Sequence, residues 1–378
     1  MHTLENYALT CGVKISEPYI YEKFFPLPVE NYITFAPFEN QEKNYPYWQE
    51  VIDKISEKTQ GNTRIVQIGS LNDARFNNCI HLNGLLNKNQ IAYIIKNSKL
   101  HFGVNDFVSQ VASFYKKKIV SITDNYSEIS RPFFSKEEDV INIESYKLLP
   151  DFKPYSVSKK EINTVKLIKP EAIYNSVLKL LGFEQENIKT LFSGEKYSNS
   201  IIYSHIPSSV YPFPQEKVME IRMDIEHNEQ ILFEQLKTNK CSIVTSKPIQ
   251  ENILKLFKNN IFCIFYRIDN VDDSSFAELV QSYGIDIHFI CNKEKIQSKK
   301  AIFYHIGDIT AINQNTLNID SKNAFYKTNR VYVRDNKVYY TLSDYKNKSE
   351  CEFGKLKKFS NENDFSEDVD FIYVVEKH

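Results

Sequence analysis

The sequence predicts an α/β fold made of two domains, each a largely parallel sheet covered by helices. Short runs of β-branched and aromatic residues alternate with helical patterns across residues 32–123, and the same alternation returns near Pro170. The chain has 378 residues, which is long for one domain. We therefore expect a first α/β domain over residues 1–125, an irregular crossover or linker over 126–168, and a second α/β domain over 169–378 that carries a β-hairpin near its end.

The first domain opens with a short helix, predicted over residues 3–11 and stopped by Gly12, because glycine often ends helices. Strands are expected at residues 32–38, 64–70, 99–106 and 117–123. Two groups of apolar residues recur at the spacing of a helix face: Trp48, Val51, Ile52 and Ile55, and Val108, Val111, Ala112 and Tyr115. Such an alternation builds a parallel sheet whose ligands bind outside the carboxyl ends of the strands.

The second alternating region begins with a helix between Pro170 and Gly182. Its apolar face is formed by Ile173, Val177, Leu180 and Leu181. Strands are then expected at residues 199–206, 241–246, 261–269, 286–292 and 301–308, and helices around residues 229–236, 249–258 and 275–283. Asp335-Asn336 lies between two alternating apolar runs, which predicts the hairpin. Residues 371–378 are expected to form an edge strand.

Composition and motifs exclude several classes of protein. The net charge is −1, so no global field draws the chain to nucleic acid or to an anionic membrane. The six cysteines are dispersed without a CxxC pair, so neither a zinc site nor a disulfide framework is expected. No GxSxG, P-loop, HExxH or GxGxxG motif is present. No signal-like segment and no apolar run of about 18 residues is found, so we expect a cytoplasmic protein.

Four short segments of the first domain carry a resemblance to a known family. Pro37 is followed by Lys43-Asn44-Tyr45-Pro46, the strand IVQIGS ends at Gly69, Leu82-Asn83-Gly84 precedes a helix, and HFGVNDFVSQVA spans residues 101–112. In order and spacing they resemble the nucleotide-sugar-binding half of the heptosyltransferase-like (family nine) glycosyltransferases. That family has the GT-B architecture of two facing Rossmann-like domains. The resemblance covers residues 1–123, about a third of the chain.

The resemblance implies a nucleotide-diphosphate sugar as donor substrate, with Lys43, Gly69, Gly103, Asn105, Asp106 and Gln110 as the binding residues. In the family the last turn brings the donor phosphates to a helix N-terminus. This chain departs from the pattern: Asn105 replaces an acidic residue, Asp106 a small hydroxyl residue, Phe107 a glycine and Gln110 a histidine. Asp106 suits a helix N-cap but repels a phosphate, so a capped helix with two solvated amides is the alternative to a donor site.

Two aspartates are candidates for the general base that takes the proton of the acceptor hydroxyl. Asp308 follows Gly307, like the glycine–aspartate pair that opens the family's acceptor domain, which in this chain would come second rather than first. Asp269 ends the predicted strand 261–269, where a carboxylate could act as a base or hold Mg²⁺. The structural alternative for this region is a helix start around Asp273.

Other polar residues have a structural and a functional interpretation. The triplet Asp224-Ile225-Glu226 resembles a metal-binding D-x-D motif, and a charged helix start is the expected alternative. His205 ends a predicted strand, where it could face a cleft. His288 and His305 lie inside predicted apolar strands and are expected in the core.

These patterns favour a metal-independent GT-B glycosyltransferase that moves a sugar from a nucleotide diphosphate to an unidentified acceptor hydroxyl and needs no cofactor. The acceptor could be a glycan, a lipid-linked glycan, a protein or a modified nucleobase. Two alternatives stay open. One is a catalytically degenerate GT-B-like protein that acts as a binding or assembly module, and the other is a nucleotide-binding α/β protein with a different activity.

Overall fold

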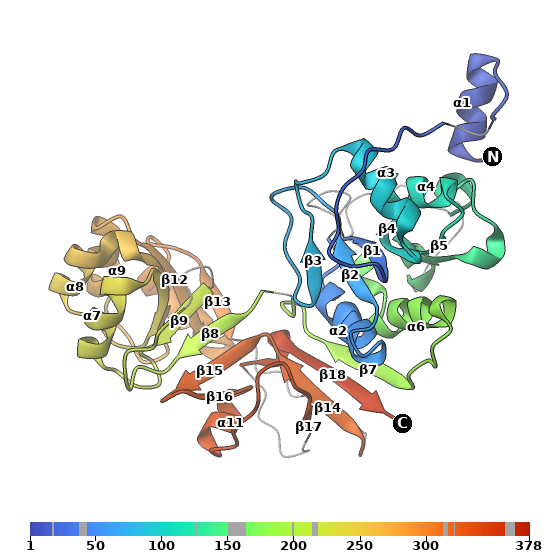
Figure 1. Ribbon diagram of the computed structural model, residues 1–378. Helices are drawn as coiled ribbons and strands as arrows, with labels where there is room; N and C mark the ends of the chain where they lie inside the picture. The colour runs from blue at the N-terminus through green and yellow to red at the C-terminus, as the bar shows by residue number, and fades with distance from the viewer. Residues whose placement is uncertain are drawn as a thin grey trace. The chain divides into compact units, whose positions relative to one another are not determined.

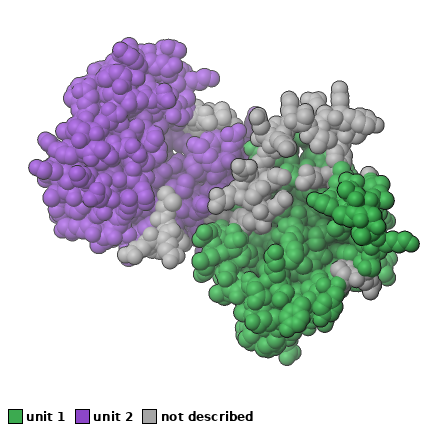
Figure 2. All heavy atoms as spheres, turned by 90° about the horizontal axis from the view of Figure 1, so that it is seen from above, with its two compact units in different colours: residues 1–188 green, residues 189–378 purple. Residues whose placement is uncertain are grey.

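A computed structural model describes residues 1–16, 19–37, 44–124, 127–149, 164–198, 200–213, 218–312, 317–320, 322–359 and 367–378. The chain divides into two compact units, residues 1–188 and residues 189–378 (Figure 2). The division falls later along the chain than the predicted boundary. Each unit contains a predominantly parallel sheet with helices, so the predicted α/β fold class is confirmed.

Six parallel strands form the sheet of the first unit, in the order β3-β2-β1-β4-β5-β6 (Figure 1). They are β1 (Tyr32–Ala36), β2 (Arg64–Gln67), β3 (Cys79–His81), β4 (Leu100–Val104), β5 (Lys118–Thr123) and β6 (Val140–Glu144). This is the strand order of the doubly wound nucleotide-binding fold. The sequence prediction did not include β3 or β6. Because β6 pairs with β5, the interval 126–168 contributes to the sheet and is more than a linker.

Helices cover both faces of this sheet. They are α2 (Trp48–Lys58), α3 (Lys88–Asn97), α4 (Phe107–Phe114) and α6 (Pro170–Leu181). The unit also contains α1 (Thr3–Cys11), which buries none of its residues, the short α5 (Ser127–Ser130) and the 3₁₀ turns η2 (Glu137–Asp139), η3 (Ser145–Leu148) and η4 (Thr164–Leu167). α3 and α4 share one core with the sheet. On the opposite face of the sheet, α2 and α6 contact each other. Trp48 of α2 packs edge-on against the sheet residues Phe35 and Phe102, with its ring centroid 4.9 Å from that of Phe35 and 6.3 Å from that of Phe102. The predicted apolar face of α2 is confirmed, since all four of its residues are buried.

The larger sheet of the second unit has eight strands in the order β13-β12-β11-β10-β9-β8-β15-β16. They are β8 (Ile202–His205), β9 (Val218–Arg222), β10 (Cys241–Thr245), β11 (Ile261–Arg267), β12 (Asp286–Asn292), β13 (Ile309–Ile312), β15 (Arg330–Arg334) and β16 (Lys337–Tyr339). Neighbours from β13 to β15 are parallel, and β16 is antiparallel to β15. The prediction did not include β9, whose Glu220 and Arg222 interrupt its apolar pattern.

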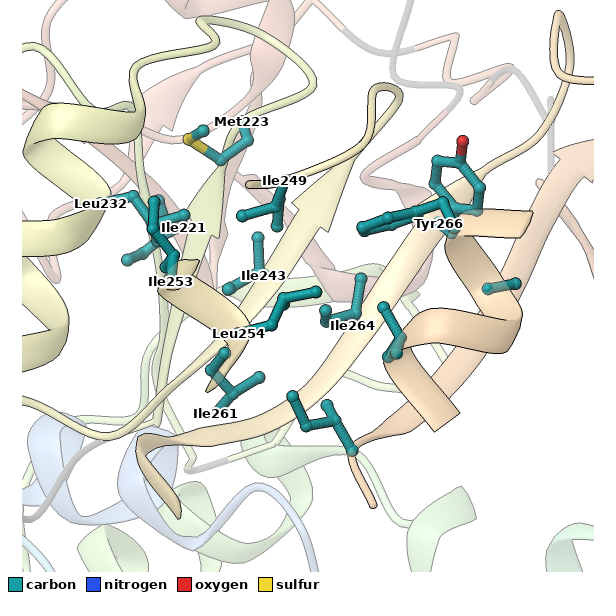
Figure 3. Packing of buried hydrophobic residues seen from close by; sticks show 14 of the residues in the cluster. Ile221, Met223, Leu232, Ile243, Ile249, Ile253, Leu254, Ile261, Ile264 and Tyr266 are labelled. Atoms are coloured by element: carbon teal, nitrogen blue, oxygen red, sulfur yellow. The ribbon is translucent and has the colours of Figure 1, made fainter. Parts of the chain in front are cut away.

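Four helices pack on this sheet around one apolar core. They are α7 (Glu229–Thr238), α8 (Glu251–Phe257), α9 (Ser275–Ser282) and α10 (Ile296–Phe303), with 3₁₀ turns η5 (Lys258–Asn260) and η6 (Lys293–Lys295). In Figure 3 Ile243 and Ile264 of neighbouring strands meet Leu232, Ile253 and Leu254 of α7 and α8. The core therefore fixes the ends of the parallel strands, where candidate catalytic groups lie.

A smaller sheet completes the second unit, in the order β17-β14-β18-β7. Its elements are β7 (Ile188–Ser193), β14 (Ala324–Thr328), β17 (Lys357–Lys358) and β18 (Ile372–Lys377), beside α11 (Leu342–Lys346) and η7 (Val369–Phe371). The predicted edge strand at 371–378 is wrong in position, because β18 lies between β14 and β7. The predicted hairpin is confirmed: Asp335 and Asn336 join β15 to β16 with φ of 49° and 64°.

The predicted strand at residues 301–308 is also wrong. Helix α10 continues to Phe303, and the strand β13 begins only at Ile309. Ile296, Lys299 and Phe303 lie on one side of this helix, and Phe303 reaches the core. The charged Lys299 conceals the helical period in the sequence, because its buried side chain is held by an ion pair of 2.6 Å to Asp272.

Candidate functional site

The two central strands of the first sheet define the place where a ligand would bind. β1 leads to α2 on one face and β4 leads to α4 on the other, so the connections diverge between their carboxyl ends. In open α/β sheets the crevice at such a switch point is the usual ligand site. Gly103 near the end of β4 has a φ of 150°, and a Cβ there would lie 2.0 Å from the Ala36 carbonyl oxygen. The close approach of β1 and β4 accounts for this glycine.

The turn from β4 into α4 is closed by the protein itself. The Asp106 carboxylate accepts hydrogen bonds from the Val108 and Ser109 amides at 2.8 and 3.1 Å, which makes Asp106 the N-cap of α4. These are the amides that a phosphate would need at this helix N-terminus. A negatively charged side chain already satisfies them, so the turn as it stands disfavours an anion.

Asn105 and Gln110 hold a neighbouring loop. The Asn105 side-chain amide donates to the Ser130 carbonyl at 2.7 Å, and that of Gln110 donates to the same oxygen at 3.2 Å. The Gln110 side-chain oxygen accepts from the Phe133 amide at 3.3 Å. Both side chains therefore tie α4 to residues 130–133, a contact that the expectation of solvated amides did not include.

Gly69, after β2, is close to a carboxylate rather than to open space. A Cβ at Gly69 would lie 2.3 Å from Asp73 Oδ2, and the same oxygen accepts a hydrogen bond from the Ser70 amide at 2.6 Å. The Gly69 carbonyl accepts from the Gly84 amide at 2.8 Å, which joins the ends of β2 and β3. A larger side chain at Gly69 would therefore have to displace the Asp73 carboxylate from this turn.

Two residues that the sequence did not single out lie at the same sheet edge. Asn83 is 2% exposed, and neither atom of its side-chain amide has a hydrogen-bond partner among the described residues. Lys88 begins α3, and its ammonium lies 5.7 Å from the ring centroid of Phe107 at the start of α4. Asn83 occupies the variable position of the Leu82-Asn83-Gly84 match, so the sequence pattern does not mark it as a functional residue. Only the structure shows that its side-chain amide is buried without a partner among the described residues. Lys43 lies outside the described residues.

The structure does not bring the two candidate bases together. Asp269 follows β11 at the carboxyl edge of the second sheet, and its Oδ1 accepts a hydrogen bond of 2.8 Å from the Asn292 amide. Asp308 precedes β13, so it lies at the opposite, amino edge. The expected strand before Gly307-Asp308 is absent from this part of the chain, because residues 301–303 belong to α10. Asp269 is the better placed of the two for chemistry at the carboxyl edge.

The D-x-D-like triplet belongs to an ion-pair network. The Asp224 carboxylate accepts two hydrogen bonds from Arg222, at 2.7 and 2.8 Å, and one from Arg267 at 2.9 Å. Burial favours the neutral acid, but the two arginines outweigh it and hold the pKa of Asp224 below its usual value. Arg267 also pairs with Glu367 at 2.9 Å. The expected helix start comes later, since Asn228 caps α7.

The three histidines differ from the expectations. His205 is buried rather than facing a cleft, and burial lowers its pKa to about 4. His288 is exposed on β12, where its ring stacks on Phe265 with centroids 5.3 Å apart. His305 lies in the turn after α10, exposed and 3.4 Å from the Glu278 carboxylate. Asp273, in contrast, lies at the start of α9 as expected, directly before the N-cap residue Ser274, and accepts a hydrogen bond from the Ser275 amide at 3.0 Å.

Two general properties follow from the described residues. Within the described ranges no group of three or more His, Cys, Asp or Glu side chains is placed to hold a metal ion. No helix among these residues is both long and apolar enough to span a membrane.

The fold and this edge define a protein with two Rossmann-like α/β units, the first of which has a nucleotide-binding strand order. Among solved structures the chain resembles ADP-heptose LPS heptosyltransferase II of E. coli, at 16% identity and a TM-score of 0.31. It also resembles a glycosyl transferase family 9 protein from Veillonella parvula, at 13% identity and a TM-score of 0.32. Each match covers 47% of this chain and 50% of the other, so the chain spans about half the length of these structures. The resemblance to family nine expected from the sequence is thus also found between structures. No protein-family model and no curated protein matches the chain.

Proposed function

We propose that the protein is a GT-B-like glycosyltransferase that binds a nucleotide-diphosphate sugar at the carboxyl edge of the first sheet. One observation carries the proposal: the parallel order β3-β2-β1-β4-β5-β6, with its switch point between β1 and β4. The order and spacing of the Pro37, Gly69, Gly84 and Gly103 segments support it from the sequence.

The donor diphosphate is held in this proposal by side-chain cations rather than by the start of α4. Asp106 satisfies the amides of that helix, so the negative charge that develops on the leaving diphosphate needs another partner. Lys43 is the candidate from the sequence, and Lys88 is the exposed cation that the structure places beside Phe107. In this scheme neither binding of the donor nor departure of the diphosphate requires a metal ion.

Asp269 is our candidate for the base that takes the acceptor proton. Its Oδ1 is held by the Asn292 amide, which orients the carboxylate and leaves Oδ2 for the proton. In the transfer step the acceptor oxygen forms a bond to the anomeric carbon, the bond from that carbon to the diphosphate breaks, and the proton passes to Asp269. The proposal does not choose among the classes of acceptor that the sequence leaves open.

A thermal-shift screen against UDP-, GDP-, ADP-, CMP- and TDP-sugars tests donor binding. A ligand present at its Kd stabilises the protein by about 0.4 kcal/mol, and at a hundredfold excess by about 2.7 kcal/mol. We expect one base to give a shift that Lys43→Ala or Lys88→Ala reduces and that Lys14→Ala, a change on the N-terminal segment, leaves unchanged. The absence of a shift with every nucleotide sugar would refute donor binding.

Release of the nucleotide diphosphate, measured with the donor that binds, tests catalysis separately. We expect Asp269→Asn to lower the rate by at least about a hundredfold, the usual contribution of a general base, while binding persists. Asp308→Asn is the matched control, because it removes a carboxylate from the opposite edge of the same sheet. Equal losses in both variants would contradict the assignment of Asp269.

The second candidate function is a binding or assembly module without transferase activity. The capped turn of α4 favours it, since Asp106 satisfies the helix amides while Asn105 and Gln110 are bonded to the 130–133 loop. The same experiments separate the two functions: a donor that binds without any diphosphate release supports the module.

A further inference from the structure

A pocket of about 330 Å³ opens on the first unit, away from the switch point. It is formed by Tyr19 and Glu22 of the segment between α1 and β1, by Phe114 and Lys116 at the end of α4, and by Phe134. α4 runs back along the sheet from the carboxyl edge, so its last residues lie near the amino edge, where β5 begins at Lys118 (Figure 1). The pocket is therefore distinct from the proposed donor site.

Aromatic rings form most of its walls. Tyr19 is 88% exposed, so its ring is available to a ligand. Phe114 and Phe134 lie with centroids 6.3 Å apart and with their planes at 90°. Perpendicular rings present one face and one edge, so they do not form the parallel slot that would clamp a flat base from both sides.

The polar groups of the pocket are fixed in place and opposite in sign. The Glu22 carboxylate accepts hydrogen bonds from the Tyr115 hydroxyl at 2.9 Å and from Lys96 at 3.0 Å. The Lys116 ammonium donates to the Phe134 carbonyl at 2.6 Å, which holds it at the rim. Each group keeps hydrogen-bonding capacity, because a carboxylate offers about four lone pairs and an ammonium three donors.

The backbone at Lys116 adds a second observation. Its φ of 54° is left-handed, a conformation that glycine adopts freely and that costs an ordinary residue about 1–2 kcal/mol. A glycine would end α4 with less strain, yet this position carries a lysine whose ammonium lies 5.7 Å from the Phe134 ring centroid. The long side chain completes the pocket wall.

We propose that this pocket binds a neutral saccharide. Its volume is at the lower end of the range of roughly 300–1,000 Å³ for small-ligand pockets, which suits one or two sugar rings. A sugar ring offers apolar C–H faces to Tyr19 and Phe134 and hydroxyl groups that both donate and accept, as Glu22 and Lys116 require. The Glu22 carboxylate is paired with Lys96 and the Lys116 ammonium with the Phe134 carbonyl, so the described residues of the pocket include no cluster of unpaired like charges that would favour an ionic ligand. The proposal does not depend on the donor site.

Saturation-transfer NMR with the full chain tests it, using maltotetraose, cellotetraose and the N-acetylated chitotetraose as probes and tetragalacturonate as the anionic comparison. We expect at least one neutral probe to receive saturation at its C–H protons and to bind at least about fivefold more tightly than the anionic one. Donor-induced thermal shifts should be unaffected by the saccharide, so this result and the donor result are read independently.

Amino-acid substitutions test whether the saccharide binds in this pocket. Tyr19→Ala should raise the Kd of that saccharide about three- to tenfold, as the loss of one aromatic contact predicts, and Lys116→Gln should raise it as well. Tyr21→Ala is the matched control, because Tyr21 is 61% exposed on the same segment but does not line the pocket. Binding of no neutral saccharide, equal binding of the acidic probe, or an unchanged Kd in both pocket variants would each overturn the proposal. Circular dichroism confirms that the variants are folded.

Discussion

Acid should destabilise the first unit through one buried histidine. His101 of β4 has no exposed surface, its Nδ1 lies 3.1 Å from the Thr34 hydroxyl, and its Nε2 has no partner among the described residues. Burial lowers the pKa of His101 to about 3, far below the value of 6.5 for a free side chain. The folded unit therefore holds a neutral ring over a pH range in which the unfolded chain takes up a proton.

The sign and the size of the effect follow from this difference. The unfolded state binds more protons below pH 6.5, so the free energy of unfolding falls as pH falls, by up to about 1.4 kcal/mol per pH unit, and levels off near pH 3. Between pH 7 and pH 4.5 the contribution of His101 amounts to about 2.5 kcal/mol. His101→Gln removes the titration while keeping a polar contact to Thr34, so it should remove that part of the pH dependence.

Urea unfolding followed by tryptophan fluorescence measures this directly. The chain has a single tryptophan, Trp48, which is buried in α2 beside Phe102, the residue next to His101. The signal thus reports the first unit. His81→Gln is the control on the same sheet. Because His81 is only partly buried, this variant should keep most of the dependence of the unfolding free energy on pH. Equal pH slopes for the wild type and His101→Gln would refute the assignment.

Three further outcomes test the fold and the site. Gly103→Ala should lower the free energy of unfolding by several kcal/mol, because its Cβ would meet a carbonyl oxygen at 2.0 Å. Gly182→Ala is the control: a Cβ there has open space, so this variant should lose only the strain energy of its φ of 81°. Tryptophan fluorescence in urea measures both variants. Asp106→Ala should lower the stability of the first unit by about 1 kcal/mol through loss of the cap, while Asp106→Asn should keep the cap and raise the affinity for a nucleoside diphosphate in titration calorimetry. Asp224→Asn should destabilise the second unit by about 3–5 kcal/mol, measured by thermal unfolding, because the buried Arg222 loses its 2.7 Å partner and is left with a longer ion pair of 3.5 Å to the Glu367 carboxylate.

The sequence predicts well the elements whose apolar residues are buried either throughout a short run or at helical spacing. The four apolar residues of the α2 face are all buried, and the strands β1, β2, β4 and β5 are short runs that are almost continuously buried, as in a parallel sheet covered on both faces. Two of the failures, at α10 and β9, occur where a charged residue is buried with an ionic partner. Lys299 conceals α10 in this way, and Glu220 and Arg222 conceal β9, whose charges pair with Arg330 and Asp224.

The hydrogen-bond partners of the candidate site residues were missed for a related reason. The sequence places Asn105, Asp106 and Gln110 at a strand end and a helix start, which the structure bears out. Their partners could not be inferred, because the loop that two of them hold lies about 20 residues later along the chain. Asn83 shows the converse case, since a buried amide without a partner is defined by what surrounds it and leaves no mark in the sequence.

The start of α4 therefore decides how a donor could bind. A phosphate at this turn would have to displace the Asp106 carboxylate, which is tethered beside the amides and needs no association step to reach them. If the carboxylate stayed, a phosphate about 5 Å away would be repelled by roughly 1–3 kcal/mol at effective dielectric constants between 80 and 20. Attraction from Lys43 and Lys88 must exceed that repulsion for the proposed donor to bind. Donor binding that strengthens in Asp106→Asn and weakens in Lys88→Ala would show that this balance of charges, rather than the helix N-terminus, controls the site.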